Sequence, residues 1–354
     1  MTIASEITKL NTNLTNSYSA VSNKGGTLPQ AQNFDNLATA ISSIPSGGGG
    51  YSELPSYQID NGVANRRSGA LTGNEFNGVT SIGDYGLYYA FYGCTGITGD
   101  VNLSLLTSVG VKGMQYAFYG CTGITSVNLS SLESVSGSST FTNAFNGCTG
   151  ITSVNLSSLK SVSGSSCMSS IFGGCTGLTG NLDLSSLVTV SGTDSSCIAN
   201  AFNGCTGITS VDLSSLESVS APYGMNSFLR NTSLVTLSFP KLTTISGNSG
   251  LSAFCLGCTE LTTASFPKLT TLTGSNVLSS AFNGCSSLEK VYFPKLTTIS
   301  QNNAFGNNTS AYIFYNCTAL TEIHFNSNAQ SVISGLSGYS TKWGATNATI
   351  YFDQ

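Results

Sequence analysis

A five-residue motif recurs along most of this chain, and it restricts the possible folds more than any other feature. In its clearest copies the motif reads Ala-Phe-x-Gly-Cys, and weaker copies follow toward the C-terminus. Successive cysteine positions, or their equivalents, lie 27, 27, 27, 30, 26, 27, 27 and 32 residues apart. A near-constant period of this length is typical of stacked supersecondary units. The copies are Ala90–Cys94, Ala117–Cys121, Ala144–Cys148, Ile171–Cys175, Ala201–Cys205, Ser227–Asn231, Ala253–Cys258 with Cys255 as an inserted residue, Ala281–Cys285 and Ile313–Cys317.

Apolar residues occupy the same places in each period. After Cys121 they stand at offsets of 3, 6, 8, 11 and 14 residues, which match neither a helical nor a strand period. The pattern predicts a coil that turns corners, with a short strand at the Val-x-Leu alternation and a single helical turn at the motif. One such coil cannot bury its apolar side, but stacked coils share a core. The predicted fold class is therefore a repeat solenoid of short β-strands and short helical turns. In two of the periods the apolar residues are Ile124, Val127, Leu129, Leu132 and Val135, then Ile151, Val154, Leu156, Leu159 and Val162.

The extended pattern Phe-x-Gly-Cys-x-x-Leu-x-x-Ile/Val-x-Leu/Phe-Pro-x-Leu-x-x-Ile resembles the BspA-like leucine-rich repeats of bacterial and phage proteins. The later copies carry the likeness best, as at Phe293–Leu296, Phe239–Leu242 and Phe266–Leu269. Earlier copies have Ser in place of Pro, as at Ser130. The likeness covers about residues 71 to 325. It implies a leucine-rich-repeat solenoid with a role in adhesion or recognition, and it implies no catalysis.

The charge content excludes several classes of partner. Charged residues make up 8% of the chain and the net charge is −4, with Lys and Arg scattered singly. Without a basic stripe to neutralise phosphates, nucleic acid and an anionic membrane surface are poor partners. No apolar run approaches the roughly 20 residues that span a bilayer, which argues against membrane insertion. Because Met1–Asn16 lacks the pattern of a secretory signal peptide, we expect synthesis in a cytoplasm and release by a route other than secretion.

Eleven cysteines raise the alternatives of disulfides and of a zinc site. Eight of them stand at the repeat position, and a free cysteine is often a small buried hydrophobe. We expect a ladder of buried, reduced thiols, with no metal and no cofactor. Cys255 and Cys258 form a C-x-x-C pair, but no second pair completes a set of four ligands. The eight are Cys94, Cys121, Cys148, Cys175, Cys205, Cys258, Cys285 and Cys317.

The residues needed for catalysis are scarce. His324 is the single histidine, and the Ile323-His324-Phe325 alternation places it on the outward side of a strand, where we expect a solvated surface histidine. Acidic residues such as Glu133 and Glu217 recur at one repeat position, which is a poor way to assemble an acid and a base. The glycines at 47–50 read as a linker and not as a phosphate loop. We therefore expect no enzymatic activity.

Two columns of residues flank the Phe of each motif and are expected to point outward. They vary between Tyr, Asn and small side chains, whereas the core columns barely vary. Tyr and Asn provide contact area and adaptable hydrogen bonds at low entropic cost. We predict a partner-binding surface here, and the alternative is that the tyrosines only cover the first edge of the solenoid. The predicted surface comprises Tyr85, Tyr88, Tyr89, Tyr92, Tyr116, Tyr119, Asn143, Asn146, Asn200 and Asn203, and in two weaker copies the columns read Asn226 with Leu229 and Ser252 with Cys255.

The first 46 residues contain no repeat. An apolar stripe at heptad spacing is followed by a second amphipathic segment that ends at Pro45. Two short helices that pack on each other are one interpretation, and an oligomerisation or docking stem is the other. We favour the stem, with a trimer as the preferred homo-oligomer. The domains are then a helical stem at 1–46, a Gly-rich linker at 47–56 and a solenoid at 57–354 that closes with a capping strand. The stripe comprises Ile3, Ile7, Leu10, Leu14 and Val21.

The stem also resembles N-terminal segments of tail-associated proteins of phages and prophages. The likeness lies in Leu10–Tyr18, Gly25–Pro29 and Phe34–Ile44, and the segment Trp343–Ile350 resembles the closing strand of such proteins. This resemblance implies that the stem docks on other virion proteins of the tail, baseplate or capsid.

Three functions fit this organisation to different degrees. A virion protein of the tail-fibre or receptor-binding type, which binds a host cell-surface glycan or protein, explains the missing signal peptide and the order of stem, linker and repeats. A bacterial cell-surface adhesin of the same repeat family is the alternative, and it would need an export signal and an anchor. An enzyme such as a glycan depolymerase lacks a candidate acid/base pair. The sequence favours the first, located in the virion after synthesis in the host cytoplasm, with the bacterial cell surface as the alternative location.

Overall fold

The computed structural model describes residues 69–71, 76, 78–192 and 196–353. The chain divides into two compact units, Met1–Ser52 and Glu53–Gln354, and all described residues belong to the second. The predicted stem at 1–46, with its stripe from Ile3 to Val21, and the linker at 47–56 lie outside the described residues.

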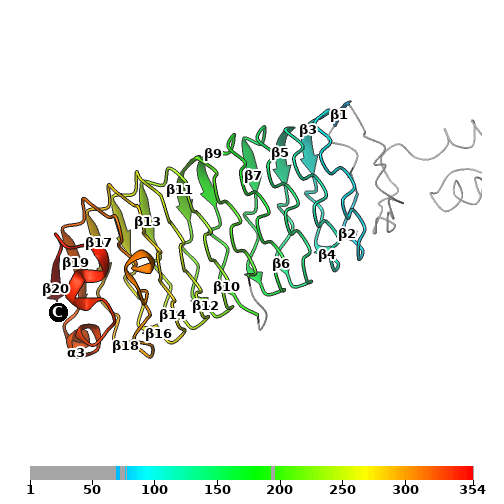
Figure 1. Cartoon of the computed structure of the whole chain (residues 1–354). Helices are drawn as coiled ribbons and strands as arrows, with labels where there is room; N and C mark the ends of the chain where they lie inside the picture. The colour runs from blue at the N-terminus through cyan, green and yellow to red at the C-terminus, as the bar shows by residue number, and fades with distance from the viewer. Residues whose placement is uncertain (1–68, 72–75, 77, 193–195, 354) are drawn as a thin grey trace, which may run out of the picture. The chain divides into compact units, whose positions relative to one another are not determined.

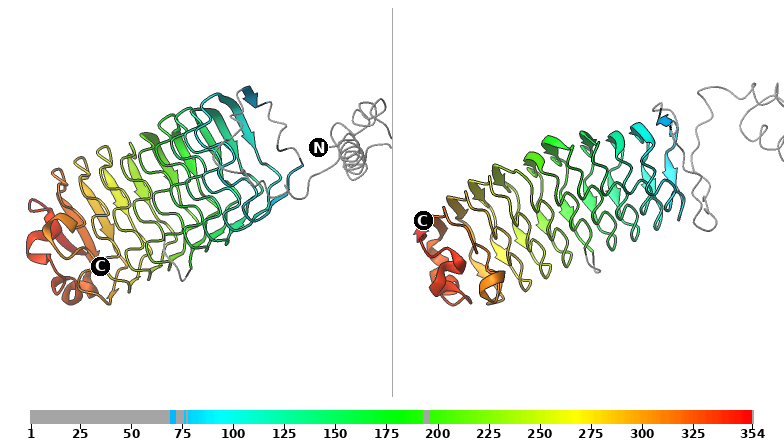
Figure 2. Two further views of the ribbon diagram at one scale, coloured as in Figure 1. Left: turned by 45° about the vertical axis from the view of Figure 1, so that its right-hand side comes forward. Right: turned by 45° about the horizontal axis from the view of Figure 1, so that its top comes forward.

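The second unit is a solenoid in which most coils contribute one longer and one very short strand (Figure 1). The two kinds of strand follow two separate lines along the solenoid (Figure 2). The longer strands are β1 (Gly69–Leu71), β3 (Ile97–Asn102), β5 (Gly123–Asn128), β7 (Ser153–Asn155), β9 (Thr179–Asp183), β11 (Gly207–Asp212), β13 (Thr236–Ser238), β15 (Thr263–Ser265), β17 (Lys290–Phe293), β19 (Glu322–Asn326) and β20 (Thr349–Asp353). The two-residue strands are β2 (Ser81–Ile82), β4 (Ser108–Val109), β6 (Ser134–Val135), β8 (Ser161–Val162), β10 (Thr189–Val190), β12 (Ser218–Val219), β14 (Thr244–Ile245), β16 (Thr271–Leu272) and β18 (Thr298–Ile299).

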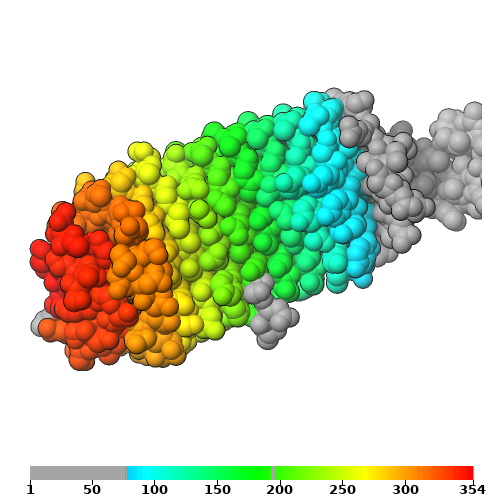
Figure 3. All heavy atoms as spheres, viewed as in Figure 1, coloured from blue at the N-terminus to red at the C-terminus, as the bar shows by residue number. Residues whose placement is uncertain are grey.

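Each strand pairs in parallel with strands of the neighbouring coils. The longer strands form three sheets, in the orders β1-β3-β5-β7, β9-β11 and β13-β15-β17-β19-β20. The short strands form the sheets β2-β4 and β6-β8-β10-β12-β14-β16-β18. Successive coils appear as adjacent bands of colour in the space-filling view (Figure 3). The predicted stack of coils, with a strand at the Val-x-Leu alternation, is confirmed.

The core lies inside the coils, and the predicted apolar columns form it. In the coil after Cys121 the five column residues are each at most 4% exposed. The Phe residues of the motif stack along the solenoid axis, with ring centroids 5.2 Å apart for Phe118 and Phe145 and 5.4 Å apart for Phe145 and Phe172. Each coil therefore buries its apolar side against its neighbours, as a single coil could not.

The Ala-Phe-x-Gly-Cys motif does not form the helical turn that we predicted. It ends a run of turns in which every fourth residue has a left-handed backbone, as at Tyr85, Tyr89 and Gly93 with φ of 57°, 56° and 67°. Alternate N–H groups bond within the coil, as from Ala90 to the Leu87 carbonyl at 3.1 Å. The N–H groups between them bond to the next coil, as from Phe91 to the Ala117 carbonyl at 2.7 Å. These bonds between coils replace the ladder of an α-helix, so every second N–H cross-links the stack.

The weaker sixth and seventh copies have a different register from the one predicted. Left-handed residues at Asn231 and Gly257 align Thr232 with Cys258, so Thr232 and not Asn231 occupies the cysteine position. Cys255 is not an insertion, because its N–H bonds to the Ala281 carbonyl as the Phe residues of other copies bond to their next coil. Here the large residue has moved one position earlier, to Phe228 and Phe254. This shift interrupts the stack of Phe rings along the solenoid, because the planes of Phe202 and Phe228 meet at 79° and not face to face.

The C-terminal end of the core is covered by short helical segments and by the last strand of its sheet. Trp343 is fully buried beneath them, and its Nε1 donates a 2.8 Å hydrogen bond to the Ser337 carbonyl. Strand β20 pairs with β19. The helical segments are η1 (Thr309–Ala311), η2 (Ser327–Ala329), α3 (Gln330–Ser334) and η3 (Tyr339–Gly344).

Candidate recognition surface

The predicted surface lies on the run of turns, which we call the turn face. In each of the first eight coils this surface has one residue with a left-handed backbone, such as Tyr89, and a second residue three positions later, such as Tyr92. The structure places six tyrosines of the first two coils together here, and we call them the tyrosine ladder. The predicted asparagines occupy the same two positions in the third and fifth coils. The ladder comprises Tyr85, Tyr88, Tyr89, Tyr92, Tyr116 and Tyr119.

The rings of the tyrosine ladder stack on one another between the two coils. Tyr89 stacks on Tyr116 at a centroid distance of 4.7 Å, and Tyr92 stacks on Tyr119 at 4.8 Å with 5° between their planes. Within the first coil Tyr88 meets the edge of Tyr89 at 4.6 Å. These spacings are close to the separation of adjacent parallel strands, because the rings follow the repeat of the backbone.

Stacking leaves ring edges and hydroxyl groups as the main surface that the ladder offers. Tyr85 and Tyr92 are each 45% exposed, whereas the other four tyrosines are half-buried. Burial, followed by the neighbouring phenols Tyr88, Tyr116 and Tyr92, raises the pKa of the Tyr89 hydroxyl. The Tyr89 phenol therefore stays neutral at physiological pH and can both donate and accept hydrogen bonds.

The backbone beneath the ladder is costly for tyrosine. Tyr85, Tyr89 and Tyr116 have φ of 57°, 56° and 56°, a left-handed conformation that costs a residue with a Cβ about 1–2 kcal/mol. Asn tolerates this conformation better and stands at the equivalent positions Asn143 and Asn200. The three tyrosines are therefore not the residues that the local backbone would favour. The same left-handed conformation recurs in the other coils at Ser170, Ser227 and Ala253, so this cost belongs to the fold and not to the ladder alone.

The asparagines continue the turn face as hydrogen-bonded pairs. Asn146 Nδ2 donates to Asn143 Oδ1 at 3.1 Å, and Asn203 Nδ2 donates to Asn200 Oδ1 at 3.4 Å. Gly173 stands between these pairs, and a Cβ there would lie 2.8 Å from Asn146 Nδ2. The alternation of amide pairs with small residues thus follows from packing between coils.

The turn face carries little charge near the ladder. Lys112 Nζ lies 5.5 Å from the centre of the Tyr85 ring, a cation–π geometry. Asp84 accepts a 2.7 Å hydrogen bond from the Val111 N–H. The turn segments 139–149, 166–176 and 196–206 contain no Asp, Glu, Lys or Arg.

In the sixth and seventh copies both predicted columns were assigned one residue too early, since the left-handed residues are Ser227 and Ala253 and not Asn226 and Ser252. Leu229 and Cys255 are fully buried in the core and do not point outward. Their outward places are taken by Arg230 and Leu256, because the register of these two copies differs by one residue. The left-handed residues define the register, but the sequence of these copies does not show which residues are left-handed.

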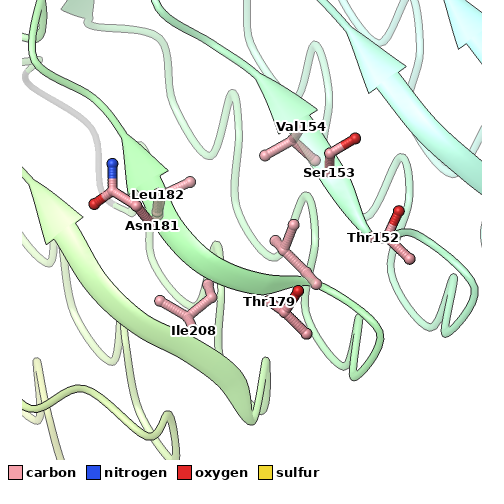
Figure 4. A pocket seen from close by; sticks show the side chains of 8 residues that line it. Thr152, Ser153, Val154, Thr179, Asn181, Leu182 and Ile208 are labelled. Carbon is pink, nitrogen blue, oxygen red and sulfur yellow. The ribbon is translucent and has the colours of Figure 1, made fainter.

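A small pocket opens on the side of the longer strands, where the sheet is interrupted between β7 and β9 (Figure 4). The coil of β9 has one residue more between Cys175 and Leu182 than the coil of β7 has between Cys148 and Val154, and Gly180 takes φ of 78°. Val154 is half-buried at the gap. The pocket measures about 60 Å³, against roughly 300–1,000 Å³ for typical ligand sites. It is too small for a cofactor. Its lining residues are Thr152, Ser153, Val154, Leu178, Thr179, Asn181, Leu182 and Ile208.

Comparison with known proteins identifies the repeats. The model of the BspA type leucine rich repeat region matches residues 70–189, 142–276, 183–311 and 307–336, which together cover more than half of the chain. This chain belongs to the BspA-type leucine-rich repeat family. The match indicates no catalytic family, and no curated protein matches the chain.

Solved structures of leucine-rich repeat proteins resemble this chain at low identity and low TM-score. The T. pallidum leucine-rich repeat protein is 20% identical, with 77% of this chain and 91% of that chain covered and a TM-score of 0.37. A leucine-rich repeat protein from Bacteroides ovatus is 19% identical, with 78% and 79% covered and a TM-score of 0.29. A leucine rich cell surface protein from Faecalibacterium prausnitzii is 14% identical, with 85% and 86% covered and a TM-score of 0.27. These likenesses concern the fold alone.

The BspA-type solenoid of this chain also holds a second polar cluster, around His324 on the outer side of β19. Our expectation of a freely solvated histidine was wrong. The imidazole lies between the rings of Tyr292 and Tyr351, at centroid distances of 4.7 and 4.8 Å, and its side chain is 17% exposed. Its Nδ1 contacts Asp353 Oδ2, and its Nε2 lies 3.1 Å from Glu322 Oε2. Glu322 belongs to the same strand, but Tyr292, Tyr351 and Asp353 come from neighbouring coils, so the sequence near His324 does not reveal them.

Glu322 connects this cluster to a lysine of the preceding coil. Lys290 Nζ lies 3.1 Å from Glu322 Oε1. The hydrogen bond from His324, and then the bond from Lys290, lower the pKa of Glu322 below its usual value. Within the described ranges no group of three or more His, Cys, Asp or Glu residues is placed to hold a metal ion. The same residues include no helix long and apolar enough to cross a membrane.

Proposed function

We propose that this chain is a non-catalytic recognition protein that acts as an adhesin at a bacterial cell surface and contacts its partner through the tyrosine ladder. The observation that carries the proposal is the gathering of six tyrosines from two adjacent coils on one solvent-facing side. Tyrosine is enriched at the energetic centres of protein-binding surfaces and in antibody paratopes. Folding of the solenoid does not require an exposed cluster of tyrosines, whereas binding to a partner does use one.

Two further features support the ladder as the contact surface. Three of its tyrosines occupy left-handed positions where most other coils have Asn, Ser, Lys or Ala, so a large aromatic residue there is a departure from the rest of the repeat. Tyr223 shows that the position can also carry an isolated tyrosine, with φ of 52° and 47% exposure. The difference between the ladder and Tyr223 is clustering, and clustering is what a contact area requires.

The virion location predicted from the N-terminal segment remains a sequence prediction. It rests on residues 1–46, which lie outside the described residues, and neither the family nor the fold supports it. Oligomerisation or docking through the stripe from Ile3 to Val21 is likewise a prediction from the sequence alone. The chain belongs to the BspA-type family, and the repeat pattern of this family implies a role in adhesion. This membership favours a location at the bacterial cell surface.

Binding of the labelled full-length chain to a panel of bacterial and mammalian cells tests the proposal, with flow cytometry as the readout. The variant Tyr89→Asn/Tyr92→Asn/Tyr116→Asn/Tyr119→Asn gives the ladder positions the residues of the third and fifth coils. We expect it to lose about tenfold or more in affinity, because truncated aromatic anchors commonly cost 2 kcal/mol or more. Tyr223→Asn is the matched control, with the same residue type, the same backbone conformation and the same face. Equal binding by the ladder variant and the wild type would refute the proposal.

A further inference from the structure

The tyrosine ladder limits the chemistry of its partner, because the ring faces that the tyrosines turn toward each other are closed. Tyr92 and Tyr119 lie parallel at 4.8 Å, and Tyr89 and Tyr116 are stacked at 4.7 Å. A partner cannot insert an apolar side chain or a ring between them. What remains accessible is a set of ring edges and phenol hydroxyls, which bind mainly by hydrogen bonds.

In the third, fourth and fifth coils the turn face continues this hydrogen-bonding surface without charge, and Arg230 of the sixth coil is the first ion beyond them. Asn143 with Asn146, and Asn200 with Asn203, present side-chain amides at the same two positions in later coils. From Gly113 to Leu132 and from Ser134 to Leu159 the chain has no charged residue. Lys112 and Asp84, the charged residues nearest the ladder in the sequence, are engaged with the Tyr85 ring and the Val111 N–H. Among the described residues from the ladder to Asn203, a strongly charged partner therefore finds no complementary ion that is not already engaged.

The groups of this surface also repeat at a constant step along the solenoid. Tyr hydroxyls and Asn amides each donate and accept hydrogen bonds, as the hydroxyl groups of a sugar do. Equivalent rings of successive coils are 4.7 and 4.8 Å apart, so donors and acceptors recur at about the length of one sugar ring. In a polymer of neutral sugars, hydroxyl groups recur regularly with each sugar unit, so they can pair with the donors and acceptors that recur with each coil.

We infer that the ligand of the turn face is a neutral, polyhydroxylated glycan chain, which lies across the coils and is held by the tyrosine ladder and the asparagine pairs. This inference rests on the proposed function, since it takes the ladder as the contact surface. A protein partner is the competing occupant. It would enclose the tyrosines as anchors in pockets of its own, but the ring faces that stack on one another are closed to it.

Binding to soluble polysaccharides tests the inference directly. The probes are neutral glucans, mannans and galactans, with dextran sulfate and polygalacturonate as charged comparators, and the full-length chain is followed by affinity electrophoresis. We expect at least one neutral polysaccharide to retard the wild type, and the four-tyrosine variant to lose about tenfold or more in affinity, whereas Tyr223→Asn does not. Raising the salt from 50 to 500 mM should change the affinity less than twofold, because screening acts on charges. Binding to none of the neutral probes, to the charged ones alone, or equally by the four-tyrosine variant overturns the inference.

Treated cells separate this inference from the proposed function. Mild periodate cleaves vicinal diols of surface sugars, whereas a protease removes surface proteins. Loss of ladder-dependent cell binding after periodate, with retention after protease, supports both ideas. Loss after protease with retention after periodate overturns the glycan and leaves the recognition function standing. Cell binding that never depends on the ladder overturns the recognition function itself.

Discussion

The thiol of Cys148 donates a hydrogen bond to the carbonyl oxygen of Phe118 in the preceding coil, with Sγ 3.0 Å from the oxygen. The same carbonyl accepts the N–H of Cys121 at 3.1 Å, so one oxygen joins two coils. The bond recurs along the stack and explains why this buried position carries a small residue with a polar hydrogen. Equivalent bonds run from Cys121 to Phe91, Cys175 to Phe145, Cys205 to Phe172, Cys258 to Leu229, Cys285 to Cys255 and Cys317 to Phe282.

Replacement of Cys148 by Val should destabilise the solenoid by about 1–2 kcal/mol, because Val fills a similar volume but leaves the Phe118 carbonyl with one donor fewer. Cys148→Ser keeps a donor and should cost less. Cys94→Val is the control, since among the described residues Cys94 Sγ has only a long contact of 3.9 Å, to the Tyr92 carbonyl of its own coil. Urea unfolding followed by circular dichroism measures the differences. Equal midpoints for Cys148→Val and the wild type would contradict the role of the thiol.

All eleven cysteines are buried and free, as predicted for the ladder positions. Burial raises the pKa of Cys121, Cys205 and Cys317 to about 12, so the reactive thiolate is scarce at pH 8. The native chain should therefore react slowly with Ellman's reagent, and all the thiols should react once urea unfolds it. Fast reaction of several thiols in the native chain would show that the coils open, or that the thiols are exposed.

The four-tyrosine variant should melt within a few degrees of the wild type. Asn relieves the left-handed strain at Tyr89 and Tyr116, about 1–2 kcal/mol for each residue. The lost ring stacking removes about 0.5–1.5 kcal/mol for each pair, so the two effects oppose each other. Differential scanning calorimetry measures the sum. A loss of more than about 3 kcal/mol, with unchanged cell binding by the folded fraction, would identify the tyrosines as a cap over the first edge of the solenoid.

The cluster around His324 should make part of the stability depend on acid. The lowered pKa of Glu322 means that its stabilising contribution is present above the unfolded pKa of about 4.3 and is lost as the pH falls through the folded value. The wild type should therefore be more stable than Glu322→Gln at neutral pH, and the difference should shrink toward pH 3. Urea midpoints at a series of pH values test this. A difference that stays constant from pH 7 to pH 3 would contradict the ion-pair role of Glu322.

The sequence by itself determined the period, the core and the burial of the thiols. Apolar columns such as Ile124, Leu129 and Leu132 can be recognised in the sequence because each repeat must bury the same side. The same physical constraint therefore acts on all nine repeats. The outward position of His324 also followed from the alternation along its strand. The concentration of tyrosines near the first motifs was likewise legible, although not the way in which their rings meet.

Only the tertiary structure decided the conformation of the turns, the register of the irregular copies and the partners of His324. Locally, Ala-Phe-x-Gly-Cys suits a helical turn, but N–H groups such as that of Phe91 bond to the next coil, and these contacts select the left-handed residues at every fourth position. At Phe254 and Cys255 the large and the small side chain have exchanged their positions in the repeat, because the neighbouring coils fill the remaining volume of the core. Tyr292, Tyr351 and Asp353 reach His324 from coils 27 to 32 residues away in the chain. In a solenoid each side chain meets residues one repeat distant, so contacts between coils settle what a single repeat leaves open.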